Sequence, residues 1–244
     1  MRALSGPEIL TIWETGWDQH PVDRALTVLA VALREAPERL AALSVGERDV
    51  LLLAVREATF GAELNGYVDC RACAEPLEFA LPVAGLRLRA PPDVGAPTHE
   101  LQADGVTLRF RLPDSRDLGA VAGCVGPDQG RRVLIERCVL EVTRDGEASA
   151  VGELSPGAVA SLAARMAELD PQAEMLLDLH CTACGHAGPV VLDIAQFFWA
   201  ELVVQAKRLL REVHVLARAY AWPESDILAM SAWRRRCYIE MVGA

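Results

Sequence analysis

Four cysteines of this chain fall into two copies of the pattern C-x-x-C, a spacing in which thiolates bind metal ions. Cys70 and Cys73 form the first pair, and Cys181 and Cys184 form the second pair 111 residues further along. Each C-x-x-C turn directs two sulfurs to one point, so two such turns complete the tetrahedral set of soft ligands that zinc prefers. The pattern therefore predicts one structural zinc site, in which protein thiolates fill every coordination position.

Each cysteine pair is predicted to lie at the tip of a β-hairpin, because it stands between two extended, apolar-rich runs. These runs cover residues 64–68 and 77–81 around the first pair, and residues 175–179 and 190–194 around the second. Both copies therefore favour the order strand, knuckle, strand.

The 107 residues between Cys73 and Cys181 far exceed the roughly 15–20 residues that separate the two pairs of a compact zinc ribbon. One shared site would join two distant segments, and three alternatives stay open: thiols kept without metal, a reducible disulfide, or two incomplete sites completed by His180 or His186. A thioredoxin-like redox motif is disfavoured, because that motif should begin a helix after a strand.

The sequence carries no catalytic motif of the G-x-S-x-G, Walker, G-x-G-x-x-G or H-E-x-x-H type. Its acidic residues are dispersed, and no pair of them indicates acid/base chemistry. Cys124, Cys138 and Cys237 stand alone and are expected to be small buried hydrophobes. We therefore expect a protein that is not an enzyme.

The net charge of −10 and the pI near 5.0 oppose broad contact with phosphate backbones, which disfavours a zinc-ribbon nucleic-acid adaptor. No apolar run approaches the roughly 18 residues that a membrane span requires. The start of the chain lacks the features of a signal peptide, so we expect a cytoplasmic protein with reduced thiols and no membrane partner.

The pattern of apolar residues divides the chain into three regions and predicts a mostly helical α+β fold. Residues 1–62 are expected to form three or four short helices, residues 63–193 a mixed β/α region with the zinc-ribbon-like site, and residues 194–244 one long helix followed by short ones. Two capping boxes mark helix starts in the first region, formed by Ser5 with Glu8 and by Ser44 with Glu47.

Local signals predict several elements of the middle region. Asp104-Gly105 is a strong hairpin turn between extended runs at 99–101 and 106–112. Residues 123–130 are expected to form a loop, and residues 132–142 are ambiguous between helix and strand. A helix should begin after Ser155 and end near Leu169.

A partner-binding surface is predicted in the C-terminal region. Within the expected helix over 195–220, Phe197, Val204 and Val215 project close to one line on the charged face, as a candidate partner stripe. In the last helix, Trp233 is expected to anchor the tail on the body, while Arg234 and Arg235 pair with acids on a partner.

Seven blocks of residues give the chain a resemblance to the T4-type baseplate hub assembly chaperone family. They are 4–10, 13–14, 20–26, the two C-x-x-C units, 193–199 and 211–238, the last ending in Trp233-Arg234-Arg235-Arg236-Cys237-Tyr238. The resemblance spans nearly the whole chain. It implies a cytoplasmic role in assembling the central baseplate hub of a contractile phage tail or a phage-like injection system.

The resemblance and the residues together predict a non-enzymatic assembly factor that binds a baseplate hub or tape-measure protein encoded in the same gene cluster. The alternative is a permanent zinc-containing structural subunit of the baseplate. A transient chaperone and a retained subunit are not distinguished by the resemblance.

Overall fold

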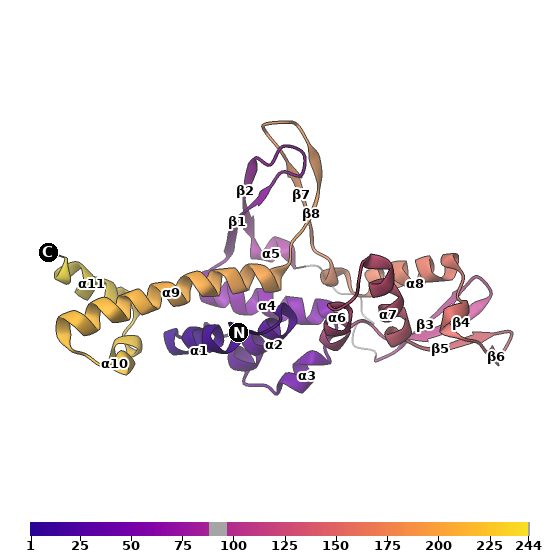
Figure 1. Cartoon of the computed structure of the whole chain (residues 1–244), viewed down its shortest axis with the longest axis horizontal. Coiled ribbons are helices and arrows are strands. Elements are labelled where there is room, and N and C mark those ends of the chain that lie inside the picture. The colour runs from indigo at the N-terminus through magenta and orange to yellow at the C-terminus, as the bar shows by residue number, and fades with distance from the viewer. Residues whose placement is uncertain (88–96, 244) are drawn as a thin grey trace.

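The computed structural model describes residues 1–87 and 97–243, and it has the predicted mostly helical α+β fold. Helix α9 (Ile194–Tyr220) runs for 27 residues, or roughly 40 Å, along the molecule. Two hairpins stand up from its N-terminal end as an arm, while the remaining strands lie at one end of the molecule and the last helices at the other (Figure 1).

The N-terminal region forms four helices, as predicted. They are α1 (Gly6–Gly16), α2 (Pro21–Leu33), α3 (Pro37–Ala41) and α4 (Val45–Phe60). Both capping boxes are confirmed: at the start of α4, the Glu47 amide donates to Ser44 Oγ at 3.2 Å, and the Ser44 amide donates to Glu47 Oε2 at 2.9 Å. The chain leaves α4 through Gly61, which has a φ of 99°, a backbone conformation that glycine adopts readily.

One hydrophobic core unites the first helices with the long helix, and we call this part the body. Leu29 and Leu53 pack with Phe198 and Leu202 of α9, and Leu64 and Leu177 at the base of the arm join the same cluster. The body therefore draws on all three regions that the sequence pattern distinguishes.

The arm consists of two antiparallel hairpins. The first pairs β1 (Glu63–Asp69) with β2 (Pro76–Pro82), and the second pairs β7 (Leu176–His180) with β8 (Ala187–Val191). The two hairpins are separate two-stranded sheets. The last extended run was expected to reach residue 194 but ends at Val191, because Asp193 accepts a hydrogen bond from the Gln196 amide at 3.0 Å and begins α9.

Residues 97–170 form a second core, which we call the insert. A four-stranded antiparallel sheet has the order β3 (His99–Ala103), β4 (Val106–Phe110), β5 (Val139–Arg144), β6 (Glu147–Ala148). The helices of the insert are α6 (Ser115–Val121), α7 (Pro127–Cys138) and α8 (Pro156–Leu169). Helix α5 (Val83–Leu86) precedes them at the foot of the arm. Short 3-10 turns cover Val151–Glu153 and Pro171–Ala173. Leu108, Phe110 and Leu162 are at the centre of this core.

Most local signals in the insert are confirmed. Asp104 and Gly105 both have positive φ, as a tight hairpin turn requires. The expected loop over 123–130 is wrong in its second half, because Pro127 begins α7, where its restricted φ suits a first helical turn. The ambiguous stretch 132–142 contains both structures, since α7 ends at Cys138 and β5 begins at Val139.

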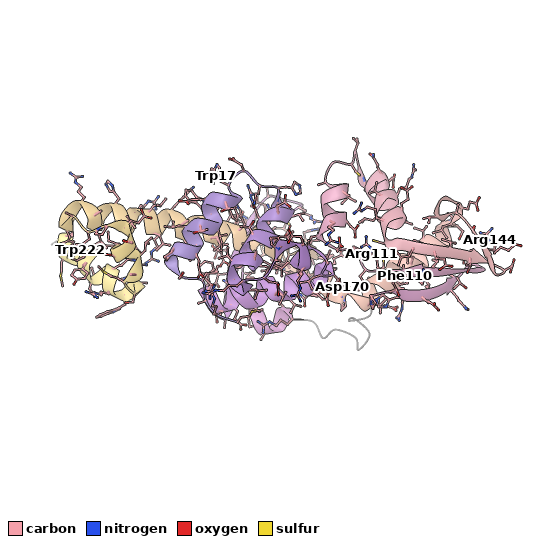
Figure 2. All side chains as sticks on the ribbon, turned by 90° about the horizontal axis from the view of Figure 1, so that it is seen from below. Trp17, Phe110, Arg111, Arg144, Asp170 and Trp222 are labelled. Carbon is pink, nitrogen blue, oxygen red and sulfur yellow. The ribbon has the colours of Figure 1, made fainter. Side chains whose placement is uncertain are left out.

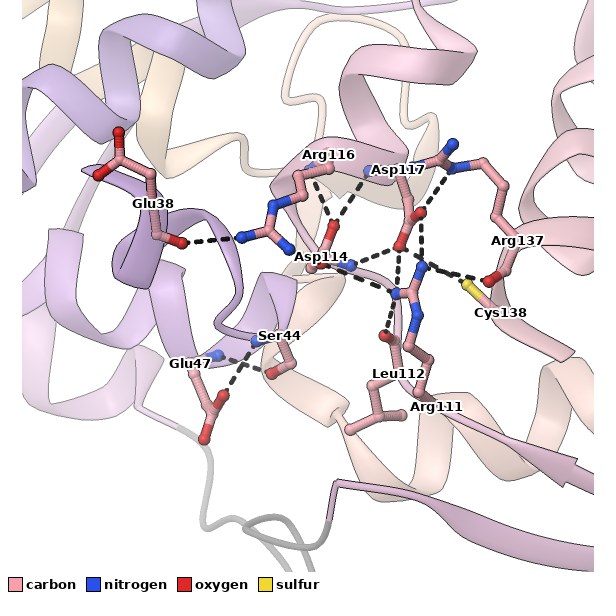
Figure 3. A network of polar contacts seen from close by, with 10 residues as sticks. All are labelled: Glu38, Ser44, Glu47, Arg111, Leu112, Asp114, Arg116, Asp117, Arg137 and Cys138. Carbon is pink, nitrogen blue, oxygen red and sulfur yellow. Dashed lines mark hydrogen bonds and ion pairs between the residues drawn. The ribbon is translucent and has the colours of Figure 1, made fainter. Parts of the chain in front are cut away.

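A polar network fixes α6 at the joint between insert and body (Figure 3). Asp117 is fully buried, and Arg111 and Arg137 donate to its two oxygens at 2.6 Å and 2.7 Å. Burial alone would raise the pKa of Asp117, but hydrogen bonds from Arg111, the Asp114 amide and Arg137 outweigh it and hold the pKa well below its usual range. Arg116 reaches the body, where it donates to the Glu38 carbonyl at 2.9 Å.

The C-terminal end consists of α10 (Glu224–Ala229) and α11 (Ala232–Val242), which fold back on α9. Ser231 caps α11, because its Oγ accepts from the Arg234 amide at 3.2 Å. Tyr220, Trp222 and Tyr238 form an aromatic cluster. Figure 2 shows that Trp222 lies at the opposite end of the molecule from Arg144 of the insert.

Candidate metal centre and partner surface

The arm brings the four predicted cysteines together at its tip. Cys70 and Cys73 lie in the turn between β1 and β2, and Cys181 and Cys184 lie in the turn between β7 and β8. All four Sγ atoms lie within 4.8 Å of one another. Two close approaches join the two hairpins, with 3.7 Å between the sulfurs of Cys70 and Cys184 and 3.6 Å between those of Cys73 and Cys181.

These distances match the geometry of a metal bound by four thiolates. A Zn–S bond of about 2.3 Å implies a sulfur–sulfur distance of roughly 3.8 Å along each edge of a tetrahedron. A disulfide would instead need its two sulfurs about 2 Å apart. The cluster contains no histidine, so one shared four-cysteine site fits better than two incomplete sites completed by His180 or His186.

The two turns have the same backbone structure. In the first, the Cys70 amide donates to the Glu75 carbonyl at 2.9 Å, and the Ala74 amide donates to the Cys70 carbonyl at 2.8 Å. In the second, Cys181 and Gly185 make the corresponding bonds at 2.8 Å and 2.9 Å. Ala74 and Gly185 both have positive φ, a conformation that is strained for alanine and easy for glycine. The sequence repeat is therefore a repeated structural unit.

Backbone amides prepare the site for a cation. Those of Ala72 and Cys73 donate to the Cys70 sulfur and lower the pKa of its thiol to about 7. The Glu75 amide lowers the pKa of the Cys73 thiol. Contact with the Cys184 thiol and burial have the opposite effect and prevail, so the pKa is raised to about 12. The surroundings thus favour the Cys70 thiolate and disfavour the Cys73 thiolate, and a bound cation would favour both thiolates.

Beside Cys70, residues of both hairpins line a mostly apolar cleft of about 400 Å³. Leu77 lines it from the first hairpin, and Leu179 and Val190 line it from the second. Since the two hairpins share no strand pairing, the cysteine cluster is what brings their tips together.

The three remaining cysteines do not join this cluster. Cys138 is buried as expected, with its thiol 3.7 Å from the Asp117 carboxylate, whereas Cys124 and Cys237 are only half-buried. Burial raises the pKa of Cys138 to about 12, so this thiol stays protonated at neutral pH.

The predicted stripe on α9 is not a continuous exposed surface. Val204 is 69% exposed, as expected. Phe197 is instead half-buried against the body core, and a Cβ on Gly66 of β1 would lie 2.8 Å from its ring. Val215 is half-buried as well. Phe197 therefore lacks the exposure that the predicted stripe requires, because the foot of the arm lies over it.

In the tail, Arg235 rather than Trp233 is buried against the rest of the chain. Arg235 is only 5% exposed and donates from Nε to Glu212 Oε2 at 2.8 Å and from its guanidinium to the Met230 carbonyl at 2.6 Å. Trp233, the expected anchor, is 76% exposed. Arg234 is exposed as predicted, with its guanidinium over the ring of Tyr238. Sequence alone did not identify Glu212 as the partner, since it lies 23 residues away on another helix.

No helix in the described part of the chain combines the length and the apolar character needed to cross a membrane.

Comparison with known proteins identifies a family. Residues 27–199, which include all four clustered cysteines, match the family described as T4 bacteriophage base plate protein. Neither the curated proteins nor the solved structures give a match to this chain. Because the matched segment spans well over half of the sequence, the chain belongs to the T4 bacteriophage base plate protein family.

Proposed function

We propose that this protein is a non-enzymatic assembly factor for the baseplate hub of a contractile phage tail or phage-like injection system. It acts in the cytoplasm and binds a hub or tape-measure protein before incorporation. Family membership supports the baseplate role, and the four-cysteine cluster at the tip of a projecting arm is the observation that carries the proposal.

The four cysteines hold a structural zinc ion. Zinc bound by Cys70, Cys73, Cys181 and Cys184 is four-coordinate and has no open position for a substrate or an activated water. The zinc ion contributes to structure alone, because it joins two hairpins that share no strand pairing. A rigid arm of this kind suits binding another protein better than catalysis.

The acidic character of the chain supports a binding role during assembly. A net charge of −10 keeps the protein soluble and disfavours binding to nucleic acid. An acidic carrier can keep a partner with exposed apolar surface in solution until that surface is covered in the baseplate.

A permanent baseplate subunit is the second candidate, favoured by the family description itself. The two functions are separated by measuring the amount of this chain in purified, assembled particles and testing particle formation without its gene. An assembly factor is required for particle formation but absent from the particles, whereas a subunit is present in fixed stoichiometry. Retention in particles would overturn the assembly-factor proposal.

A further inference from the structure

Helix α11 carries an apolar stripe that faces solvent. Trp233, Cys237 and Met241 are spaced by four residues and so lie along one side of the helix. Trp233 is 76% exposed and Met241 is 65% exposed, while Cys237 between them is half-buried. We call these three residues the α11 stripe.

The helix that carries the stripe is held firmly. Arg235, on another side of α11, is buried in its ion pair with Glu212 of α9. Tyr238 packs edge-on against both Tyr220 and Trp222, with ring centroids 5.7 Å and 4.9 Å apart. The stripe is therefore presented on a fixed helix, so its residues are already in place for a partner.

Unpaired positive charge borders the stripe. Near the stripe, Arg208 and Arg235 form ion pairs with Glu212. Arg234 and Arg236 form no ion pair within residues 1–87 and 97–243. Glu240 is the only carboxylate on α11, and it forms no ion pair with Arg236 in the described structure. Two exposed guanidinium groups thus have no carboxylate partner in the described structure, and that of Arg234 lies over the ring of Tyr238.

Charge is distributed unequally along the chain. Residues 200–244 carry seven Lys and Arg against five Asp and Glu, whereas residues 1–199 carry 17 against 29. The basic end of an acidic protein selects an acidic partner by charge complementarity. Tryptophan, methionine and arginine are also among the side chains enriched at protein interfaces.

We propose that the α11 stripe, with Arg234 and Arg236 beside it, is the docking site for an acidic amphipathic segment of another baseplate protein. Apolar side chains of that segment cover Trp233 and Met241, and its carboxylates pair with the two arginines. The inference rests on the proposed partner-binding function and adds the surface and the chemistry of the partner.

Photo-cross-linking tests the site directly. Each baseplate protein encoded beside this chain is co-expressed with it, with benzoylphenylalanine replacing either Trp233 or, as a control, the half-exposed Trp17 of the body. We expect cross-links from position 233 alone, to a segment rich in Asp and Glu. Cross-links from position 233 to a second copy of this chain or to nucleic acid would overturn the proposal.

Charge reversal tests the two arginines. R234E/R236E should weaken binding of the cross-linked baseplate protein by about tenfold or more at low salt, and reduce the salt dependence of that binding. The matched control, R132E/R144E, reverses two exposed arginines on the insert and should leave binding unchanged. Melting temperatures of both variants should equal that of the parent protein.

The outcomes separate this inference from the proposed function. If a baseplate protein binds the parent and R234E/R236E equally well, the docking site is wrong while the partner-binding function stands. If no baseplate protein of the cluster binds the parent chain, both are wrong.

Discussion

Asp170, the residue directly after α8, accepts a hydrogen bond at 2.9 Å from the backbone amide of Gly46 in the first turn of α4, 124 residues earlier in the chain. Both residues are buried, and the bond joins the insert to the body. A carboxylate at a helix N-terminus also meets the positive end of the helix dipole. Close by, the Val45 amide donates to the Pro113 carbonyl at 3.0 Å. The start of α4 is therefore one place at which the two cores are attached, beside the contact of Arg116 with the Glu38 carbonyl.

Gly46→Ala should weaken this attachment. An added Cβ would lie 1.8 Å from Asp170 Oδ1, so the carboxylate must move and lose its bond to the amide while remaining buried. We expect a loss of about 2–4 kcal/mol in the free energy of unfolding, measured by urea denaturation. Gly119→Ala, where nothing lies within 4 Å of the added atom, should be neutral or stabilising. Equal stability of the two variants would contradict the assigned role of Asp170.

Asp117→Asn should destabilise the insert at neutral pH by about 3–5 kcal/mol, because it removes the charge that Arg111 and Arg137 contact. The pKa of Asp117 is lower in the folded protein than in the unfolded chain. Its contribution is therefore fully present above the unfolded pKa of about 3.9 and is lost as the pH falls towards the folded pKa.

Urea denaturation from neutral pH down to about pH 3 tests whether the stabilisation by Asp117 decreases as the pH falls. The stability difference between the parent and Asp117→Asn should stay constant above about pH 5 and shrink below it. Asp145→Asn, in an exposed turn, is the matched control and should show no such difference. A difference that persists unchanged in acid would show that the ion pairs of Asp117 do not stabilise the fold.

The metal centre predicts about one zinc ion per chain on elemental analysis. Cys181→Ser should lower the melting temperature by roughly 5–10 °C, because an incomplete ligand set no longer joins the two hairpins. Cys124→Ser changes a cysteine outside the cluster and should have little effect. Metal-free protein with four free thiols and an unchanged melting temperature would rule out the structural role.

Local chemistry explains what could be read from the sequence. The C-x-x-C repeat predicted the convergence of four sulfurs, because each turn encodes its own geometry. Ser44 and Ser155 predicted helix starts, since a cap needs only neighbouring residues. The hairpin turn at Asp104-Gly105 is equally local.

Contacts between distant segments could not be read in the same way. Periodicity places Phe197 on the charged face of α9, but the absence of a side chain at Gly66 lets β1 lie against it. Three adjacent arginines point in three directions, and only the position of Glu212 decides which of them is buried. The shared core of the N-terminal and C-terminal helices is likewise a tertiary property.

Val204→Asp should leave the fold intact and change the melting temperature by no more than about 2 °C, because Val204 is largely exposed. Leu202→Asp, two residues earlier, buries a carboxylate in the body core and should prevent folding. Circular dichroism and the yield of soluble protein distinguish the two. Unfolding of Val204→Asp would show that this side of α9 is covered.

Arg235→Ala should release α11 from α9 without unfolding the body. The substitution removes the ion pair with Glu212 and the bond to the Met230 carbonyl, leaving Glu212 with Arg208 as its remaining ion-pair partner in the described structure. We expect hydrogen exchange of the α11 amides to accelerate about 10–100-fold, a loss of roughly 1.5–3 kcal/mol of local stability.

The neighbouring Arg236→Ala serves as the control, because Arg236 is exposed and its loss should leave exchange unchanged. Glu212→Ala should accelerate exchange in α11 as Arg235→Ala does, and the double variant should cost less than the sum of the two single variants, since both remove one ion pair. Equal exchange in Arg235→Ala and Arg236→Ala would mean that the aromatic cluster alone holds α11 in place, whereas full additivity with Glu212→Ala would mean that Arg235 and Glu212 do not act through a shared ion pair.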